Sequence, residues 1–208
     1  PVPFWEYAIP AVKAQFPEII FIAEIYEPNK YSEFIQAGFD YLYDKVGLYD
    51  TTRAIIEGKA TTHKISEVWK ALNGIDGKML RFLENHDEQR IASRFFANNP
   101  WKGLPGMALA AFMNTGPLML YFGQELGEPA TGVSGFSGDD GRTSIFDYTQ
   151  VPELNKWINQ GAFDDELLSE NQQKLRQAYQ QILLFASRNP IFSTGRFYDL
   201  MWINEDLP

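Results

Sequence analysis

The chain has 208 residues, of which 45% are hydrophobic and 22% charged, and its formal net charge is −9. That length and balance are typical of one sizeable globular domain, and the acidic charge argues against a nucleic-acid partner, which requires a basic face. Because the sequence has no cysteine and no apolar run of about 18 residues, it excludes disulfides, a cysteine nucleophile and a membrane span, and we expect a soluble protein, either secreted or periplasmic or cytoplasmic.

Helical and strand-like segments alternate along the first part of the chain. Apolar residues at helical spacing predict a helix over residues 3–16, which Pro10 is expected to kink because it removes a backbone donor. A strand-like apolar run follows at 19–23, then a short helix at 32–37 and a second strand-like run at 39–43.

The alternation continues through the second part of the chain. It predicts a helix at 65–72, a strand at 78–83, a helix at 104–112, a strand at 118–122 and an amphipathic helix at 175–186. Strands that alternate with helices predict a parallel sheet with right-handed crossovers, so the expected fold class is α/β. Because the strand-like runs are almost continuously apolar, we expect both faces of the sheet to be buried.

Two segments lie outside this alternation. Residues 123–170 are rich in glycine and acidic side chains, and a connection of that length is expected to be functional or disordered. Residues 195–203 look like a strand and are expected to begin a further structural unit after the strand–helix units. Since the chain opens on a helix, we also expect a strand upstream and interpret the chain as part of a longer protein.

Polar side chains directly follow two of the predicted strands. The run 19–23 ends in Glu24, and the run 78–83 ends in a polar cluster at 84–87. The carboxyl ends of parallel strands are where α/β folds build their sites, so we expect these carboxylates to meet. Glycoside hydrolysis requires a carboxylate pair, although ordinary strand-end caps or salt-bridge partners would explain the same residues.

No cofactor or metal signature accompanies these carboxylates. The glycines that follow the predicted strands fit neither a dinucleotide fingerprint nor a Walker sequence. One of the two histidines, His63, is interpreted as a solvated loop residue, and residues 138–141 lack the alternating acidic spacing of a calcium loop. We therefore expect chemistry without a cofactor or a metal.

Three segments resemble signatures of the alpha-amylase family, glycoside hydrolase family 13. Residues 82–87, Phe-Leu-Glu-Asn-His-Asp, resemble the seventh-strand signature, although Glu84 stands where the family most often has Asp. Residues 22–26 are similar to the fifth-strand signature, a Glu followed two residues later by an aromatic residue. Residues 121–127 are similar to the eighth strand, with its Tyr-x-Gly-x-Glu run. The three segments occur in the order of the family.

The resemblance implies the C-terminal half of a (β/α)8 TIM barrel over residues 1–190, about four parallel strand–helix units from the fourth helix through the eighth. Residues 191–208 would begin a β-rich C-terminal domain. The implied activity is that of a retaining glycoside hydrolase on α-linked glucans such as starch and maltooligosaccharides. Glu24 would be the general acid/base, and Asp87 would stabilise the oxocarbenium-like transition state. The substrate-binding residues implied are Asn85, His86, Tyr26 and Arg90.

The family's nucleophile, an Asp at the end of the fourth strand, has no counterpart in this sequence. We therefore expect the 208-residue chain alone to be inactive and to associate with the missing barrel half or with itself. Any calcium would belong to the longer parent. A non-catalytic alpha-amylase-like binding or accessory protein is the alternative, and an unrelated α/β protein with a small-molecule site is a third interpretation.

Overall fold

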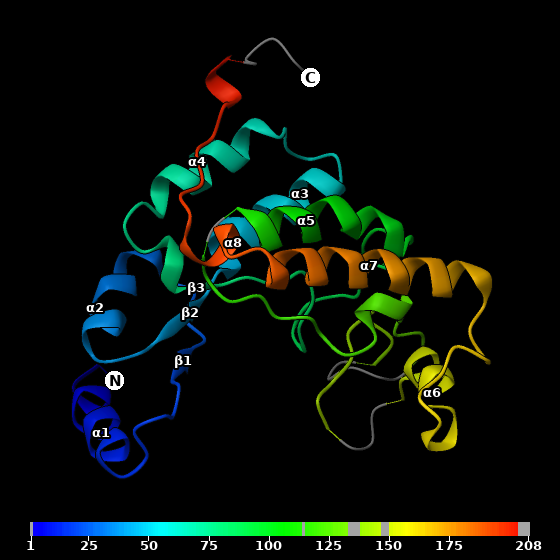
Figure 1. Ribbon diagram of the computed structural model, residues 1–208, viewed down its shortest axis with the longest axis horizontal. Helices are drawn as coiled ribbons and strands as arrows, with labels where there is room; N and C mark the ends of the chain where they lie inside the picture. The colour runs from blue at the N-terminus through cyan, green and yellow to red at the C-terminus, as the bar shows by residue number, and fades with distance from the viewer. Residues whose placement is uncertain (1, 114, 133–137, 147–149, 204–208) are drawn as a thin grey trace.

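The computed structural model describes residues 2–113, 115–132, 138–146 and 150–203, along which helices and short strands alternate (Figure 1). The α-helices are α1 (Val2–Gln15), α2 (Tyr31–Gln36), α3 (Asp50–Ile56), α4 (His63–Ala71), α5 (Leu104–Phe112), α6 (Pro152–Ile158), α7 (Glu170–Arg188) and α8 (Ile191–Thr194). A π-helical turn covers Lys45–Tyr49, and 3-10 turns cover Pro28–Lys30, Asp76–Lys78, Pro100–Gly103, Gln124–Leu126, Asn159–Gly161 and Met201–Ile203. None of the helices in these segments is long and apolar enough to cross a membrane.

A small parallel sheet lies between the helices. Its strands are β1 (Ile22–Ala23), β2 (Tyr41–Tyr43) and β3 (Met79–Leu80), in the order β1-β2-β3. Arg81 extends the sheet by a parallel bridge to Leu118. The predicted parallel arrangement is therefore confirmed, with three strands and one bridge in place of four full strands. The paired segments are shorter than the apolar runs because only the residues with a partner alongside them form a ladder.

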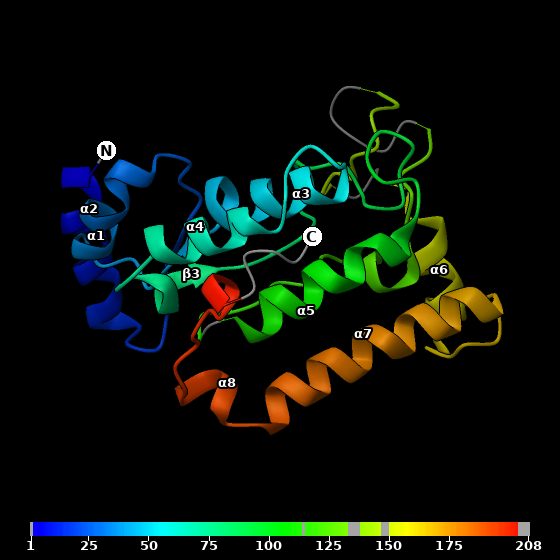
Figure 2. The ribbon, with the colours of Figure 1, turned by 90° about the horizontal axis from the view of Figure 1, so that it is seen from above.

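The helices begin and end where local sequence signals place them. The bounds of α5 coincide with the predicted helix at 104–112. α7 opens on a capping box in which the Ser169 side chain accepts from the Gln172 amide and the Gln172 side chain accepts from the Ser169 amide. Its buried residues, Leu175 and Tyr179, face α5, so the two helices pack side by side (Figure 2).

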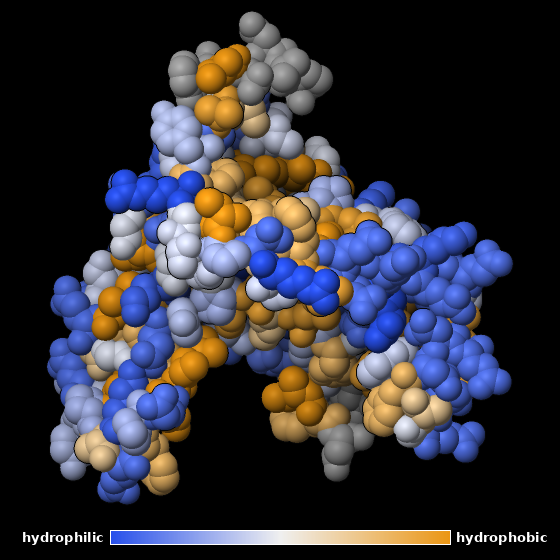
Figure 3. All heavy atoms as spheres, in the orientation of Figure 1, coloured by the Kyte–Doolittle hydropathy of each residue, from blue (hydrophilic) through white to orange (hydrophobic). Residues whose placement is uncertain are grey.

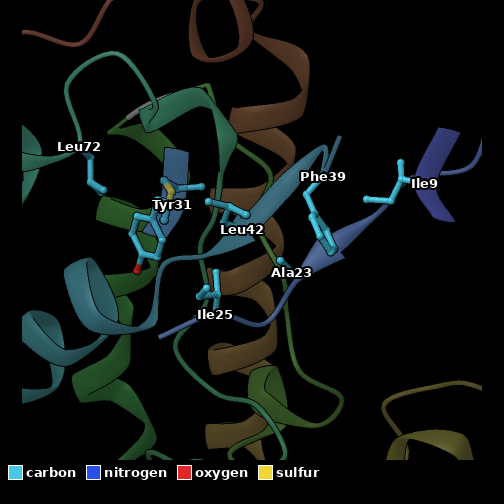
Figure 4. Packing of buried hydrophobic residues seen from close by; sticks show 8 residues of the cluster. Ile9, Ala23, Ile25, Tyr31, Phe39, Leu42 and Leu72 are labelled. Atoms are coloured by element: carbon cyan, nitrogen blue, oxygen red, sulfur yellow. The ribbon is translucent and has the colours of Figure 1, made fainter. Parts of the chain in front are cut away.

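The main core lies between the sheet and the first helices (Figure 4). One side chain from each strand points into it, namely Ala23, Leu42 and Met79. These strand residues pack with buried residues from α1, α2 and the connecting segments: Ile9, Ile25, Tyr31, Phe39 and Leu72. The alternation of a strand puts the neighbouring residues on the opposite face. This core therefore fixes which strand residues face the other way.

The opposite face of the sheet is open. Ile22 is 47% exposed, whereas its neighbour Ala23 is 5% exposed. The prediction of burial on both faces is therefore wrong for β1. An open hollow of about 400 Å³ lies on this side, lined by Ile22, Glu24, Tyr43, Leu80, Leu118 and Met119. Figure 3 shows the molecule notched between the end that carries α1 and the end that carries α6.

Two segments differ from their predicted structure. The stretch 123–170 contains α6, whose first residue is Pro152, although we expected a loop there. Residues 195–203 form no strand, and instead Phe197 and Tyr198 pack edge-on against Trp69 of α4. No described strand lies beside this segment to complete a ladder, so the β-rich C-terminal domain stays a prediction.

Candidate active site

The carboxyl ends of β1 and β3 bring three of the predicted site residues together. Glu24 follows β1 directly, and His86 and Asp87 lie in the loop that follows β3. One ligand atom from each of these side chains lies within 4.8 Å of the other two. His86 Nε2 lies 3.6 Å from Asp87 Oδ2. Two carboxylates and an imidazole therefore lie close enough to contact one sugar ring.

The aromatic residue two positions after Glu24 belongs to the same cluster. The Tyr26 hydroxyl donates a hydrogen bond to Glu24 Oε1. Burial, together with the negative charges of Glu24 and Asp87, raises the pKa of Tyr26, so the hydroxyl keeps its proton at neutral pH. Its side of the site remains open, since Tyr26 is 41% exposed. Tyr26 can thus orient the carboxylate and still offer ring surface to a ligand.

Asn85 makes its contacts within the loop that follows β3. It is buried, and its Oδ1 accepts hydrogen bonds from the backbone N–H groups of Asp87 and Glu88, both at 2.9 Å. The Asn85 side chain therefore shapes the turn that presents Asp87. The assignment of Asn85 to substrate binding stays a prediction.

Arg90 also makes its contacts inside the protein. It is fully buried, and its guanidinium donates to Glu84 Oε2 at 2.7 Å, to Thr143 Oγ1 at 3.0 Å and to the Phe122 carbonyl at 2.9 Å. The ring of Tyr121 lies 4.3 Å from the guanidinium carbon. The three donors of Arg90 are thus directed at partners within the protein, and its assignment to substrate binding stays a prediction.

A charged cluster beside the site was missed by sequence reasoning. Lys45 Nζ lies 3.1 Å from Glu88 Oε1 and 2.6 Å from Asp50 Oδ1, and it lies 5.9 Å from the centre of the Tyr26 ring. Burial works to lower the pKa of Lys45, but Asp50 and Glu88 together raise it, so the amine is charged. Lys45 follows the predicted strand 39–43 by two residues, and inspecting the end of that strand would have found it.

The cluster of Glu24, His86 and Asp87 also has the donor atoms of a metal site. Among the described residues, Glu24, His86 and Asp87 form the one group of three or more His, Asp or Glu side chains whose ligand atoms come this close together. Carboxylate oxygen and imidazole nitrogen are ligands that several divalent metals accept. The arrangement suits acid/base chemistry equally well.

Residues 4–191 match the family described as alpha amylase, catalytic domain. The chain belongs to the alpha-amylase family. No curated protein matches it. The fold of this alpha-amylase family member is similar to that of three solved enzymes, and its sequence identity to each of them is below 25%.

The first of these enzymes is the cyclic alpha-maltosyl-(1→6)-maltose hydrolase from Arthrobacter globiformis, with a TM-score of 0.67 and 22% identity over 94% of this chain and 40% of that one. The alpha-amylase from H. orenii has a TM-score of 0.62 and 18% identity, over 94% and 41%. The alpha-amylase from Lactobacillus plantarum has a TM-score of 0.57 and 18% identity, over 94% and 43%. The chain thus spans about two fifths of the length of each, and its short parallel sheet is consistent with part of a TIM barrel.

Proposed function

We propose that this chain carries the acid/base half of the active site of a retaining glycoside hydrolase that acts on α-linked glucans. The observation that carries the proposal is the cluster of Glu24, His86 and Asp87 at the carboxyl ends of two parallel strands. Membership of the alpha-amylase family supports it. The similar Arthrobacter globiformis hydrolase, which was solved with maltose, supports the choice of an α-glucan.

Glu24 acts as the general acid/base in this proposal. In a retaining glycosidase one carboxylic acid protonates the leaving oxygen and then, as a carboxylate, takes a proton from the attacking water. The hydrogen bond from the Tyr26 hydroxyl fixes the rotamer of Glu24, so that the carboxyl group does not have to be oriented during the reaction. The hollow lined by Glu24 and Tyr43 leaves room for a ligand on the open side of the sheet.

Asp87 and His86 bind the sugar at its reacting end. Positive charge develops on the ring as the glycosidic bond breaks, and a nearby carboxylate lowers the energy of that state more than that of the substrate. The Asn85 turn presents Asp87 by holding the amides of Asp87 and Glu88. His86, beside Asp87, is placed to donate to a sugar hydroxyl.

A retaining mechanism needs a further carboxylate as the nucleophile, about 5 Å from the acid. Within the described segments, the cluster holds only Glu24 and Asp87, whose roles are assigned above. We infer that the nucleophile lies on strands outside this chain, which spans about 40% of its structural neighbours. The exposed Ile22 face of β1 supports this, because further barrel strands would cover it.

The test compares the purified 208-residue chain with a longer polypeptide that includes the rest of the barrel, both assayed on starch and maltooligosaccharides. We expect no turnover by the chain alone, and turnover by the longer polypeptide that Glu24→Gln reduces by about 10³-fold. Turnover by the chain alone that is lost in Glu24→Gln would refute the inference that the nucleophile lies outside this chain. It would still support Glu24 as the general acid/base. Binding of maltooligosaccharides without turnover by the longer polypeptide would favour the non-catalytic accessory protein.

A further inference from the structure

One buried side chain joins the three segments that surround the candidate active site. The guanidinium of Arg90 bonds to Glu84 in the loop after β3, to the Phe122 carbonyl beyond the bridge residue Leu118, and to Thr143 in the long connection. These partners come from positions far apart in the sequence, and Glu84 and Thr143 are themselves buried. Each of the three polar contacts uses a different nitrogen, so every nitrogen of the planar guanidinium has a partner.

Two further contacts reinforce this junction without involving the guanidinium. The backbone N–H of Arg90 donates to the Gly141 carbonyl at 2.7 Å, and the Tyr121 hydroxyl donates to the Thr143 carbonyl at 2.6 Å. Arg90 also lies over the Tyr121 ring. The long connection is therefore attached to the loop after β3 by backbone and side chain together.

Glu84 closes the loop that carries the catalytic candidates. One carboxylate oxygen accepts from Arg90, and the other accepts from the backbone N–H of Ile91 at 2.7 Å. His86 and Asp87 lie between these two anchored ends, on backbone that has no regular secondary structure. Burial raises the pKa of Glu84, and the charge of Arg90 opposes that shift. Without Arg90, one oxygen of the buried Glu84 carboxylate would have no partner, and the loop would lose one of its anchors.

We propose that Arg90 is a positioning residue that holds His86 and Asp87 in register with Glu24. The inference rests on the proposed function of Asp87. Arg90 touches neither the sugar nor the reacting atoms in this account, so it acts through the geometry of the loop. A displacement of about 1 Å at a catalytic group lowers a rate by as much as about 10²-fold. Loss of Arg90 is therefore expected to lower kcat out of proportion to any change in stability.

The sequence provides a readout that does not depend on activity. It has two histidines, His86 in the anchored loop and His63 on α4. The histidine ring signals of the 208-residue chain, followed by ¹H–¹³C NMR, therefore report the site and a remote helix separately. In Arg90→Lys, which keeps the charge but cannot make the three planar contacts, we expect the His86 signal to shift or broaden and the His63 signal to stay in place.

The matched control is Arg94→Lys. Arg94 lies four residues further along and pairs with Asp139 at 2.6 Å, but its side chain is largely exposed. We expect neither histidine signal to change, and we expect unchanged kcat in the longer polypeptide. Thr143→Val is the milder second variant, because it removes one acceptor from Arg90 and keeps the shape of the side chain.

In the longer polypeptide, at a temperature where each variant is folded, we expect Arg90→Lys to lower kcat about 10²-fold with a smaller change in KM. Unchanged His86 signals in both Arg90→Lys and Thr143→Val would overturn the proposal. If Arg90→Lys fails to fold, Thr143→Val decides alone, and an unmoved His86 signal in it counts against the proposal. If no form of the longer polypeptide turns over substrate, the proposed function fails, while the His86 signal still tests whether Arg90 holds the loop.

Discussion

The Tyr26 hydroxyl donates a hydrogen bond to Glu24 Oε1, and these two exposed residues lie on either side of the buried Ile25. This alternation of burial, together with the hydrogen bond, puts the two side chains on the same side of the chain. The sequence pattern of a Glu followed by an aromatic residue therefore has a direct physical meaning here: the ring that borders the site also orients its acid.

Tyr26→Phe removes the hydroxyl and keeps the ring. We expect kcat of the longer polypeptide to fall about 10-fold, since a hydrogen bond to the carboxylate that forms as Glu24 gives up its proton contributes about 1.5 kcal/mol, and each 1.36 kcal/mol changes a rate tenfold. KM for maltooligosaccharides should change little, because the ring surface remains. Tyr7→Phe, at a largely exposed position on α1, is the control. Equal kcat values for Tyr26→Phe and the parent would show that this hydrogen bond does not orient the acid.

Asp40 connects α1 to the segment that leads into β1. Its carboxylate accepts from Lys13 Nζ at 2.8 Å and from the Phe21 backbone N–H at 2.8 Å. Burial raises the pKa of Asp40, but these donors outweigh it and bring the pKa below its ordinary value of 3.8. A carboxyl whose pKa is lower in the folded state stabilises the fold fully above its unfolded pKa. That contribution is lost as the pH falls through the lower, folded value.

Asp40→Asn is therefore expected to destabilise the chain by about 1 kcal/mol at pH 7. The difference between parent and variant should begin to shrink as the pH falls past 3.8, where Asp40 of the unfolded parent becomes protonated, and it should be lost as the pH falls through the lower pKa of the folded state. Urea unfolding of parent and variant at pH 7 and pH 3 measures the difference in free energy of unfolding at each pH. A difference that stays constant, or that grows toward acid pH, would show that the Lys13 and Phe21 contacts do not lower this pKa.

The capping box of α7 makes a stability prediction that is independent of the site. Ser169→Ala removes the acceptor for the Gln172 amide and is expected to cost about 1 kcal/mol. Ser187→Ala is the matched control, because this exposed serine donates only to the Leu184 carbonyl within the helix. Thermal unfolding of the two variants should separate them, with Ser169→Ala clearly less stable. Equal midpoints would mean that the end of α7 is held by its packing alone.

The regular elements were predictable where the signal was local. The apolar spacing at 104–112 predicts the observed bounds of α5, and Gly116 and Pro117 follow shortly after the helix ends. α6 was missed although Pro152 stands at its first turn, where proline is favoured. The acidic and glycine-rich surroundings concealed that signal.

The carboxylates of the candidate site were predictable from the sequence, but the buried contacts behind them were not. Glu24 and Asp87 stand at strand ends, so topology alone brings them together. The contacts of Arg90 could not be predicted from sequence, because one of its partners, Thr143, is 53 positions away along the chain. The contacts of Asn85 with the amides of Asp87 and Glu88 could not be predicted either, because they belong to a turn that forms only once β3 and the loop after it are in place.

The role of Glu24 is tested most directly by supplying a substrate that needs no acid. In the longer polypeptide, Glu24→Ala should slow hydrolysis of maltooligosaccharides by about 10³-fold but slow consumption of α-maltosyl fluoride far less, because fluoride leaves without protonation. Azide should then accelerate the variant by breaking the ester between the nucleophile and the sugar, and give an α-maltosyl azide. Glu27→Ala, which removes an exposed partner of Lys30, should behave as the parent. Equal losses on both substrates, with no effect of azide, would contradict Glu24 as the general acid/base.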